Sequence, residues 1–375
     1  MTASVYREDH EMFRHSVRRF IEREIVPNHA QWEHDGVVPR SLWLSAGREG
    51  LLCVMAPEAN GGAGGDYGHS AVIIEELARA NATAVGFTTH SEIVSNYLVA
   101  YGNDEQNKRW LPRLISGEMI AVIAMTEPGM GSDLRSMRTT IRRDGDDYIV
   151  NGSKTFITNG INSGLAVVAG KMDPASKELT LICIEEGTPG FEKGKKLEKI
   201  GLRGQDTSEL FFNDVRVPVA NRLGEENQGF GYLSHQLAWE RLIIAIRAIA
   251  SIEALLQETI DYTKERKVFG QSVFDFQNSR FALAAAKADA TMLRVFVDDC
   301  LAKVMVGELT AERAAMAKLI GSEMQNRLLD QFLQLHGGYG FMSEYKIARA
   351  WVDARVARIY GGTSEIMKEI IARGL

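Results

Sequence analysis

One acidic residue lies in the middle of an otherwise apolar helical face in the C-terminal half of the chain. With a 4-3-4-4 spacing, this face carries Leu233, Leu237, Glu240, Ile244 and Ala248. Its apolar members predict burial, and a buried carboxylate is costly unless it has a partner or a use. The helix alone leaves two interpretations open: an ion pair, for example with Arg247, or a general base.

The stretch "MTEPGMGSD" (125–133) could hold a flat or anionic ligand. Gly129 and Gly131 let the backbone approach such a ligand closely. Thr126 and Ser132 add hydroxyl groups and neighbouring amides. The alternative interpretation is the end of a strand followed by a Pro-Gly turn.

Two further stretches carry groups that could contact a ligand. In "TFIT" (155–158), Phe156 and Thr158 point to the same face of a strand, although an aromatic residue on a strand can equally belong to the core. In "ERKVFG" (265–270), the fork of donors on Arg266 suits a phosphate. A basic residue at a helix end also complements the helix dipole, so that interpretation stays open as well.

Three regions with different apolar periodicity would position these residues. The first is helical, the second alternates as strands do, and the third contains long helical stretches without internal proline. We therefore predict an α+β multidomain fold. Its parts are an N-terminal α-helical domain (1–120), a small antiparallel β-domain (121–225) and a C-terminal four-helix bundle (226–375).

The β-domain is predicted most clearly by "TTIRRDGDDYIVNGSKTFIT" (139–158), which alternates apolar and polar residues. Two dipeptides in it, Asp144-Gly145 and Asn151-Gly152, are typical of hairpin turns. Both are therefore predicted as turns, in a small antiparallel barrel or sandwich.

Composition limits the classes of function. The chain has 375 residues and a formal net charge of −6, which argues against nucleic acid or an anionic membrane as the main partner. Its three cysteines are far apart and predict neither a zinc site nor a redox pair. The sequence contains no run of 18 apolar residues, so no membrane span is predicted. The N-terminus lacks the apolar segment of a signal peptide. A cytoplasmic enzyme without a metal is expected.

Several motifs together resemble the acyl-CoA dehydrogenases over essentially the whole chain. In order, they are "AMTEPGMGSD" (124–133), "NGSKTFITNG" (151–160), "ERKVFGQSVFDFQ" (265–277), "QLHGGYGF" (334–341) and "IYGGTSEI" (359–366). The segments "WERLIIA", "FVDDCL" and "VDARVARIYGGTSEIMKEII" look most like the long-chain branch. The resemblance implies the same three-domain fold, FAD as cofactor, an acyl-CoA substrate and an electron-transfer flavoprotein as acceptor.

The resemblance also implies which residues form the site. The flavin would be contacted by Met125, Thr126, Gly131, Ser132, Phe156, Thr158, Arg266, Phe269, Gln277, Gln334, Gly337, Gly338, Thr363 and Glu365. The substrate would be contacted by Ser132, Arg241, Gly361 and Gly362. Because Arg266, Gln277 and segment 334–338 match residues that reach the flavin of a neighbouring subunit, we expect a homotetramer arranged as a dimer of dimers. His336 is expected to be structural.

The chain departs from many family members at Gly361, where they carry a glutamate that acts as the base. The long-chain and isovaleryl branches also lack that glutamate, and they take the base from a helix, directly before an arginine. Glu240 and Arg241 match those positions. The resemblance thus favours Glu240 as the base that removes the α-proton, with hydride transfer to flavin N5 and a trans-2-enoyl-CoA as product.

Several alternatives remain open. The substrate could be branched, as in isovaleryl-type enzymes. The electrons could go elsewhere, as in an acyl-CoA oxidase or a flavin monooxygenase of the same superfamily, although the length disfavours the larger oxidases. The chain could also be a non-catalytic flavoprotein that binds a partner or DNA, which the acidic net charge and the intact Glu240 disfavour.

Overall fold

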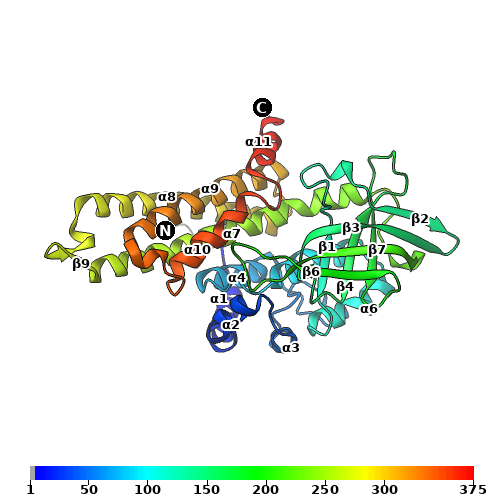
Figure 1. Cartoon of the computed structure of the whole chain (residues 1–375), viewed down its shortest axis with the longest axis horizontal. Coiled ribbons are helices and arrows are strands. Elements are labelled where there is room, and N and C mark those ends of the chain that lie inside the picture. The colour runs from blue at the N-terminus through cyan, green and yellow to red at the C-terminus, as the bar shows by residue number, and fades with distance from the viewer. Residues whose placement is uncertain (1–4) are drawn as a thin grey trace.

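The computed structural model describes residues 5–375. Figure 1 shows a helical arm on one side and a β-domain on the other, and α7 (Gly229–Glu265) passes from one to the other. At about 1.5 Å per residue, this 37-residue helix is roughly 55 Å long. Groups at its two ends therefore cannot contact the same small region of one molecule.

The N-terminal region is helical and packs beneath the middle of α7 (Figure 1). Its α-helices are α1 (Glu8–Phe20), α2 (His29–Asp35), α3 (Arg40–Arg48), α4 (Tyr67–Arg79), α5 (Ser95–Tyr101) and α6 (Asp104–Ile115). Two π-helical segments interrupt the regular helices, η1 (Ile21–Ile25) and η4 (Thr88–Val94). Helix α4 is buried on most sides because it packs against α1, α7 and α8.

The middle region is a sandwich of two four-stranded sheets. One sheet has the order β1 (Ala121–Ala124), β4 (Leu165–Gly170), β5 (Thr180–Glu185), β8 (Arg222–Leu223). The other has the order β2 (Thr140–Asp144), β3 (Asp147–Thr158), β7 (Thr207–Pro218), β6 (Phe191–Lys196). Apolar side chains from both sheets, such as Val168 and Val150, form the core between them.

The C-terminal region consists of long helices around α7. They are α8 (Gln277–Met305), α9 (Ala311–His336), α10 (Lys346–Ala354) and α11 (Ser364–Ala372). A short hairpin of β9 (Lys267–Val268) and β10 (Gln271–Ser272) joins α7 to α8 at the tip of the helical arm (Figure 1). The predicted class, helices, then strands, then a helical bundle, is confirmed. The predicted domain limits stay predictions.

Two details of the β-domain differ from the sequence-based prediction. The Asp144-Gly145 turn does join β2 to β3, but Asn151-Gly152 lies inside β3 and makes no turn. There the register to β7 shifts between Val150 and Gly152, so the glycine belongs to a bulge. In addition, β1 pairs with β4 in parallel, whereas the other neighbouring strands of the two sheets pair antiparallel.

Within residues 5–375, no helix combines the length and the apolar character that a membrane crossing would require.

Candidate active site

Glu240 lies on α7 and is buried, with 8% of the residue exposed. Its carboxylate oxygen Oε1 accepts a hydrogen bond from the hydroxyl of Tyr97 on α5, at 3.0 Å. Burial raises the pKa of the Glu240 carboxyl to about 7, against the lowering effects of the Tyr97 hydrogen bond and the charge of Arg241. The group that Glu240 contacts is thus a tyrosine, and the ion pair with Arg247 considered from the sequence is not formed.

Two cations hold the glycine pair of the C-terminal motif against α7. The Arg241 guanidinium donates to the carbonyl of Gly361 at 3.4 Å, and Lys318 Nζ on α9 donates to the carbonyl of Gly362 at 2.6 Å. Burial, followed by the nearby Arg241 charge, lowers the pKa of Lys318 to about 8. The two glycines are therefore positioned through their backbone carbonyls, next to the part of α7 that carries Arg241 and Ile244.

Gly361 has little room for a side chain as the backbone stands. Its φ of +65° lies in the left-handed region, and a Cβ atom would come within 2.6 Å of Ile244 Cδ1. Ile244 shares its face of α7 with Glu240, so Gly361 and Glu240 flank the same part of the helix. A base that is at position 361 in many family members and at position 240 in this chain would need these two positions to lie near the same part of the helix.

A buried ion pair shapes the glycine-rich loop after β1. Lys154 Nζ lies 2.9 Å from Glu127 Oε1 and also donates to the Met125 carbonyl at 3.0 Å. Glu127 further accepts backbone N–H groups of Arg138 and Thr139. These contacts fix the start of the loop, whereas positions 129, 131 and 132 stay exposed.

Phe156 is an apolar ring held out toward solvent by an unusual backbone. Its φ is +60°, at a bulge of β3 between Lys154 and Ile157, and 68% of the residue is exposed. The neighbouring Thr155 N–H donates to the Thr126 carbonyl at 2.9 Å, so the strand and the loop are held together. Strain of this kind persists where the surrounding structure enforces it, commonly at ligand sites.

The β-domain features fit a planar, partly anionic group such as FAD. An exposed aromatic ring offers a flat apolar surface, and open space above Gly129 and Gly131 leaves the loop amides accessible. Met125, Thr126 and Thr158 are half-buried beside them, and Ser132 is exposed. The structure thus brings together the first group of predicted flavin residues.

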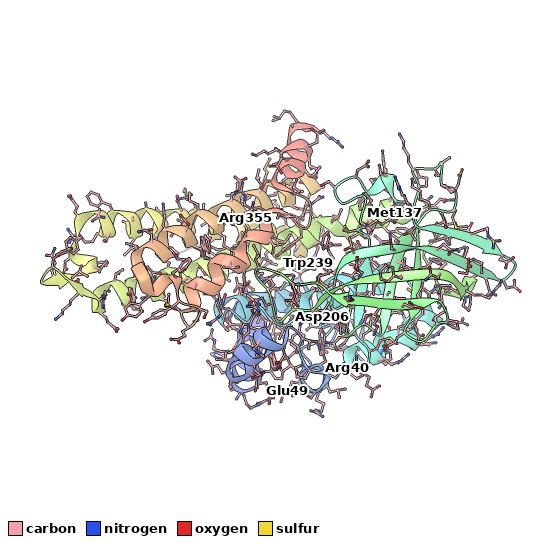
Figure 2. All side chains as sticks on the ribbon, viewed as in Figure 1. Arg40, Glu49, Met137, Asp206, Trp239 and Arg355 are labelled. Carbon is pink, nitrogen blue, oxygen red and sulfur yellow. The ribbon has the colours of Figure 1, made fainter. Side chains whose placement is uncertain are left out.

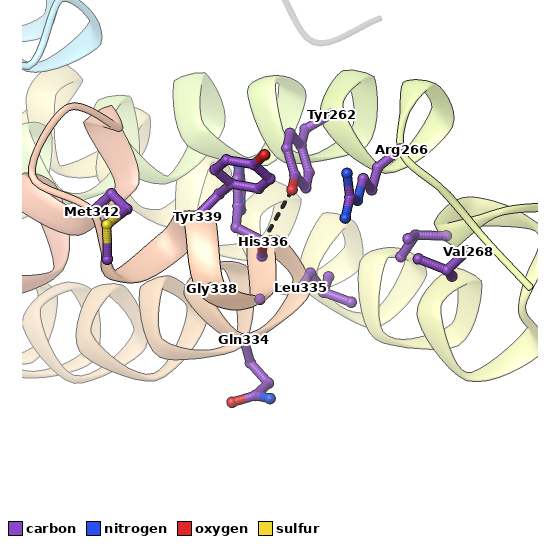
Figure 3. Close-up of a pocket in the computed structure, with 11 residues that line it drawn as sticks. Tyr262, Arg266, Val268, Gln334, Leu335, His336, Gly338, Tyr339 and Met342 are labelled. Carbon is purple, nitrogen blue, oxygen red and sulfur yellow. Dashed lines mark hydrogen bonds between the residues drawn. The ribbon is translucent and has the colours of Figure 1, made fainter.

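A second group of predicted flavin residues lies at the tip of the helical arm: Arg266, Phe269, Gln277, Gln334, Gly337 and Gly338. Of these, Arg266, Gln334, Gly337 and Gly338 line an open groove of about 490 Å³ between the ends of α7 and α9. The Arg266 guanidinium lies 5.5 Å from the centre of the Tyr339 ring, and Tyr262 stacks on His336. Figure 3 shows Arg266, Tyr262 and Tyr339 on one side of this groove, with Gln334 pointing away from them.

Several predicted residues of this group are open to solvent. Gly337 and Gly338 are exposed, as is Gln277 at the start of α8, and Phe269 on the hairpin tip is 96% exposed. His336, by contrast, is buried, and its Nδ1 donates to the Phe332 carbonyl at 2.8 Å, a contact within its own helix that fits a structural role.

One chain does not bring the two groups together. Glu240 and Glu265, both on α7, are separated by roughly 38 Å of helix at about 1.5 Å per residue. In Figure 1 the β-domain and the β9 hairpin occupy opposite ends of the molecule. Thr363, which caps α11, and the exposed Glu365 lie near the middle, beside the glycine pair.

Sequence reasoning missed four side chains of this site: Tyr97, Glu127, Lys154 and Lys318. Lys154 and Glu127 lie within the quoted motifs "NGSKTFITNG" and "AMTEPGMGSD", and the charge of Lys154 at an inward position of the alternating strand could have marked it, whereas Glu127 lies in the loop after β1. Tyr97 lies in an ordinary helical stretch, 143 residues from Glu240, and carried no signal.

A separate cluster of possible metal ligands has another explanation. Asp9, His10 and His69 present ligand atoms within 4.8 Å of one another. However, Asp66 lies 2.9 Å from one ring nitrogen of each histidine and caps the N-terminus of α4. We therefore assign this cluster to helix capping.

Family models match three consecutive parts of the chain. The acyl-CoA dehydrogenase N-terminal domain matches residues 7–118, the middle domain 122–215 and the C-terminal domain 227–375. The chain belongs to the acyl-CoA dehydrogenase family. The family consists of FAD-dependent oxidoreductases that act on acyl-CoA, so the predicted cofactor is confirmed.

Individual relatives are similar over almost the full chain. The mitochondrial long-chain specific acyl-CoA dehydrogenase of Sus scrofa is 48% identical over 98% of this chain and 87% of its own. The mitochondrial isovaleryl-CoA dehydrogenase of Pongo abelii is 35% identical over 98% of this chain and 88% of its own. A crystal structure of an acyl-CoA dehydrogenase from Geobacillus kaustophilus is 47% identical, with a TM-score of 0.96 and 98% of each chain covered.

Proposed function

We propose that the chain is a long-chain acyl-CoA dehydrogenase in which Glu240 removes the α-proton of the substrate. The observation that carries this proposal is Glu240 itself, a buried carboxyl with a pKa near 7 beside a glycine at position 361. A general base works best with a pKa near the working pH. The higher identity to the long-chain relative supports a straight acyl chain over an isovaleryl group.

In this mechanism the residues of the chain bind, orient and deprotonate. The ionised Glu240 takes the proton from the carbon next to the thioester carbonyl, while Arg241 and Lys318 hold the glycine backbone that borders the acyl chain. When bound, FAD supplies the acceptor for the hydride that leaves the β-carbon. Because Glu240 is buried, water has little access to the carboxylate that takes the α-proton of the substrate.

The residues proposed to hold the cofactor fall into two groups. Phe156, Thr158 and the loop 125–132 would hold the flavin ring of their own subunit, together with Thr363 and Glu365. Arg266, Phe269 and the exposed segment 334–338, with Gln277, would reach the FAD of a neighbour. The separation of the two groups along α7 supports an assembly in which a neighbouring subunit completes each flavin site, and we propose a homotetramer arranged as a dimer of dimers.

The proposal also covers the electron acceptor and the cellular location of the enzyme. Electrons would leave through an electron-transfer flavoprotein, as the family membership supports. The cytoplasmic location predicted from the sequence remains part of this proposal.

The direct test is anaerobic bleaching of the flavin by a panel of acyl-CoA thioesters from C4 to C18, including isovaleryl-CoA. We expect straight chains of C12 or longer to reduce it faster than isovaleryl-CoA does. Slow reoxidation in air should follow, which distinguishes a dehydrogenase from an oxidase. A preference for isovaleryl-CoA would support the branched-chain alternative. If no thioester bleaches the flavin, the proposal that the chain is an acyl-CoA dehydrogenase fails.

Arg266→Ala should lower the FAD content of the purified protein, because the lost guanidinium would leave a phosphate of the neighbour's cofactor unpaired. The measurement is the flavin-to-protein absorbance ratio, together with light scattering. Arg280→Ala serves as a control, since Arg280 is also exposed near this tip but donates to the Asp275 carbonyl of its own chain. A fully flavinylated monomer would contradict the arrangement across subunits.

A further inference from the structure

The segment before α5 is a π-helix, η4, and it lies directly against the residues around Glu240. At its end the N–H of Ser95 donates to the carbonyl of His90, five residues back, as a π-turn requires. π-Helical turns are rare and occur frequently at functional sites. This turn therefore raises the question of what it positions.

The backbone of η4 contacts α7 one residue before the base. The carbonyl of Glu92 accepts the indole N–H of Trp239 at 3.1 Å and the side-chain amide of Asn96 at 2.9 Å. Trp239 is buried and also packs its ring edge-on against Tyr67 of α4. Figure 2 places Trp239 near the centre of the molecule, where the helices meet the β-domain.

The side chain that follows this turn contacts the base itself. Tyr97 is fully buried, and its hydroxyl donates to Glu240 Oε1 at 3.0 Å. Burial, followed by the nearby Glu240 charge, raises the pKa of Tyr97 well above its usual value, so the phenol keeps its proton. Trp239 and Glu240, consecutive on α7, are thus both hydrogen-bonded by residues of the 92–97 segment.

The other titratable groups around the carboxyl cannot replace this contact. Arg241 forms no hydrogen bond or ion pair with Glu240 and donates instead to the Gly361 carbonyl, while Lys318 from α9 donates to the Gly362 carbonyl. Tyr101, one turn beyond Tyr97, bonds His235 instead, at 2.9 Å. Among the described residues, Tyr97 is the side chain that donates a hydrogen bond to Glu240.

We propose that Tyr97 is a positioning residue for the base: its hydroxyl holds one oxygen of Glu240, which leaves the other oxygen for the α-proton, and η4 sets the place of Tyr97. This inference rests on the proposed role of Glu240. A hydrogen bond donated to the ionised carboxylate also favours that form. Tyr97 would therefore keep the base both oriented and deprotonated near neutral pH.

Tyr97→Phe tests the role of the hydroxyl with the ring retained. We expect the pH at which flavin reduction by palmitoyl-CoA reaches half its maximum to rise by about one unit, since a one-unit shift is the usual scale for one such contact. At pH 7 the rate should fall about 5-fold, because the ionised fraction of a carboxyl with a pKa of about 7 drops from about one half to about one tenth, and at high pH most of the rate should return. An unshifted profile would overturn the proposal.

Tyr101→Phe is the matched control, because it removes a hydroxyl one turn away that does not contact Glu240. Its pH profile should coincide with that of the wild type. Trp239→Phe removes the contact to the Glu92 carbonyl, so it should slow reduction at every pH without moving the profile. If either variant shifts the profile as far as Tyr97→Phe does, the shift reports loosened packing and the proposal fails.

An infrared titration gives a reading that does not depend on turnover. The carboxylic acid band of Glu240, assigned by its absence in Glu240→Gln, should disappear at higher pH in Tyr97→Phe than in the wild type. If Glu240→Gln reduces flavin normally, the proposed function fails as well. If Glu240→Gln is inactive but the band of Tyr97→Phe titrates as in the wild type, only the role of Tyr97 is rejected.

Discussion

Glu240→Gln should fold, bind FAD and reduce it roughly 10²–10⁴-fold more slowly than the wild type when saturated with a long-chain acyl-CoA. The amide has nearly the same shape as the carboxyl and can still accept the hydrogen bond of Tyr97, but it cannot take a proton. The measurement is stopped-flow bleaching of the flavin, with flavin content and melting temperature as checks on folding.

The wild type should also show the pKa of this group in its pH profile. Because burial raises the pKa of Glu240 to about 7, the base is protonated below that pH and ionised above it. The rate of flavin reduction should therefore rise with pH through about 7 and then level off. In Glu240→Gln this rise should vanish.

Glu258→Gln is a suitable control for the same substitution on the same helix. Glu258 lies about five turns further along α7 and pairs with Lys346 at the surface. We expect its rate and pH profile to match those of the wild type. A Glu240→Gln enzyme that reduces flavin at nearly the wild-type rate would show that Glu240 is not the base.

Glu240→Gly combined with Gly361→Glu should regain a measurable part of the activity that Glu240→Gly alone loses. The glycine and the glutamate flank the same face of α7, so a carboxylate at position 361 should approach the same carbon from the other side. Recovery should be partial, since a misplacement of about 1 Å can cost about 10²-fold. It should also favour C8 over C16 acyl-CoA, because the new side chain narrows the space.

The structure identifies the obstacle that this double mutant meets. A Cβ atom at position 361 would lie 2.6 Å from Ile244 Cδ1, and the φ of +65° costs a residue other than glycine about 1–2 kcal/mol. Adding Ile244→Val removes the Cδ1 atom and should increase the recovery further. Ile244→Val alone provides the matched control.

Gly361→Glu alone gives the complementary result. It would set two carboxylates close together, which raises the pKa of one of them. That variant should be slow, with its pH profile displaced upward. If neither the double nor the triple variant exceeds Glu240→Gly with either substrate, while both keep FAD and a normal melting temperature, the two positions do not act on one carbon.

Local sequence patterns were sufficient to predict the order of the helices and strands and part of the candidate active site. The 4-3-4-4 spacing on α7 predicted a buried face, and the structure buries Glu240 on it. Apolar periodicity and glycine-containing turns depend on near neighbours in the chain, which is why the order of helices and strands could be predicted. The same reasoning failed at Asn151-Gly152, where pairing of β3 with β7 outweighed the local turn preference.

Only the tertiary structure decided what surrounds the carboxylate. Tyr97 meets Glu240 because the π-turn of η4 and the packing of α5 on α7 join segments far apart in sequence, and no local pattern encodes such a contact. The same holds for Lys318 at the glycine carbonyl. The sequence alone identified Glu240 as the candidate base and Gly361 as the position without a carboxylate. The burial that raises the pKa of the Glu240 carboxyl to about 7 arises only when helices distant in sequence pack together and exclude water.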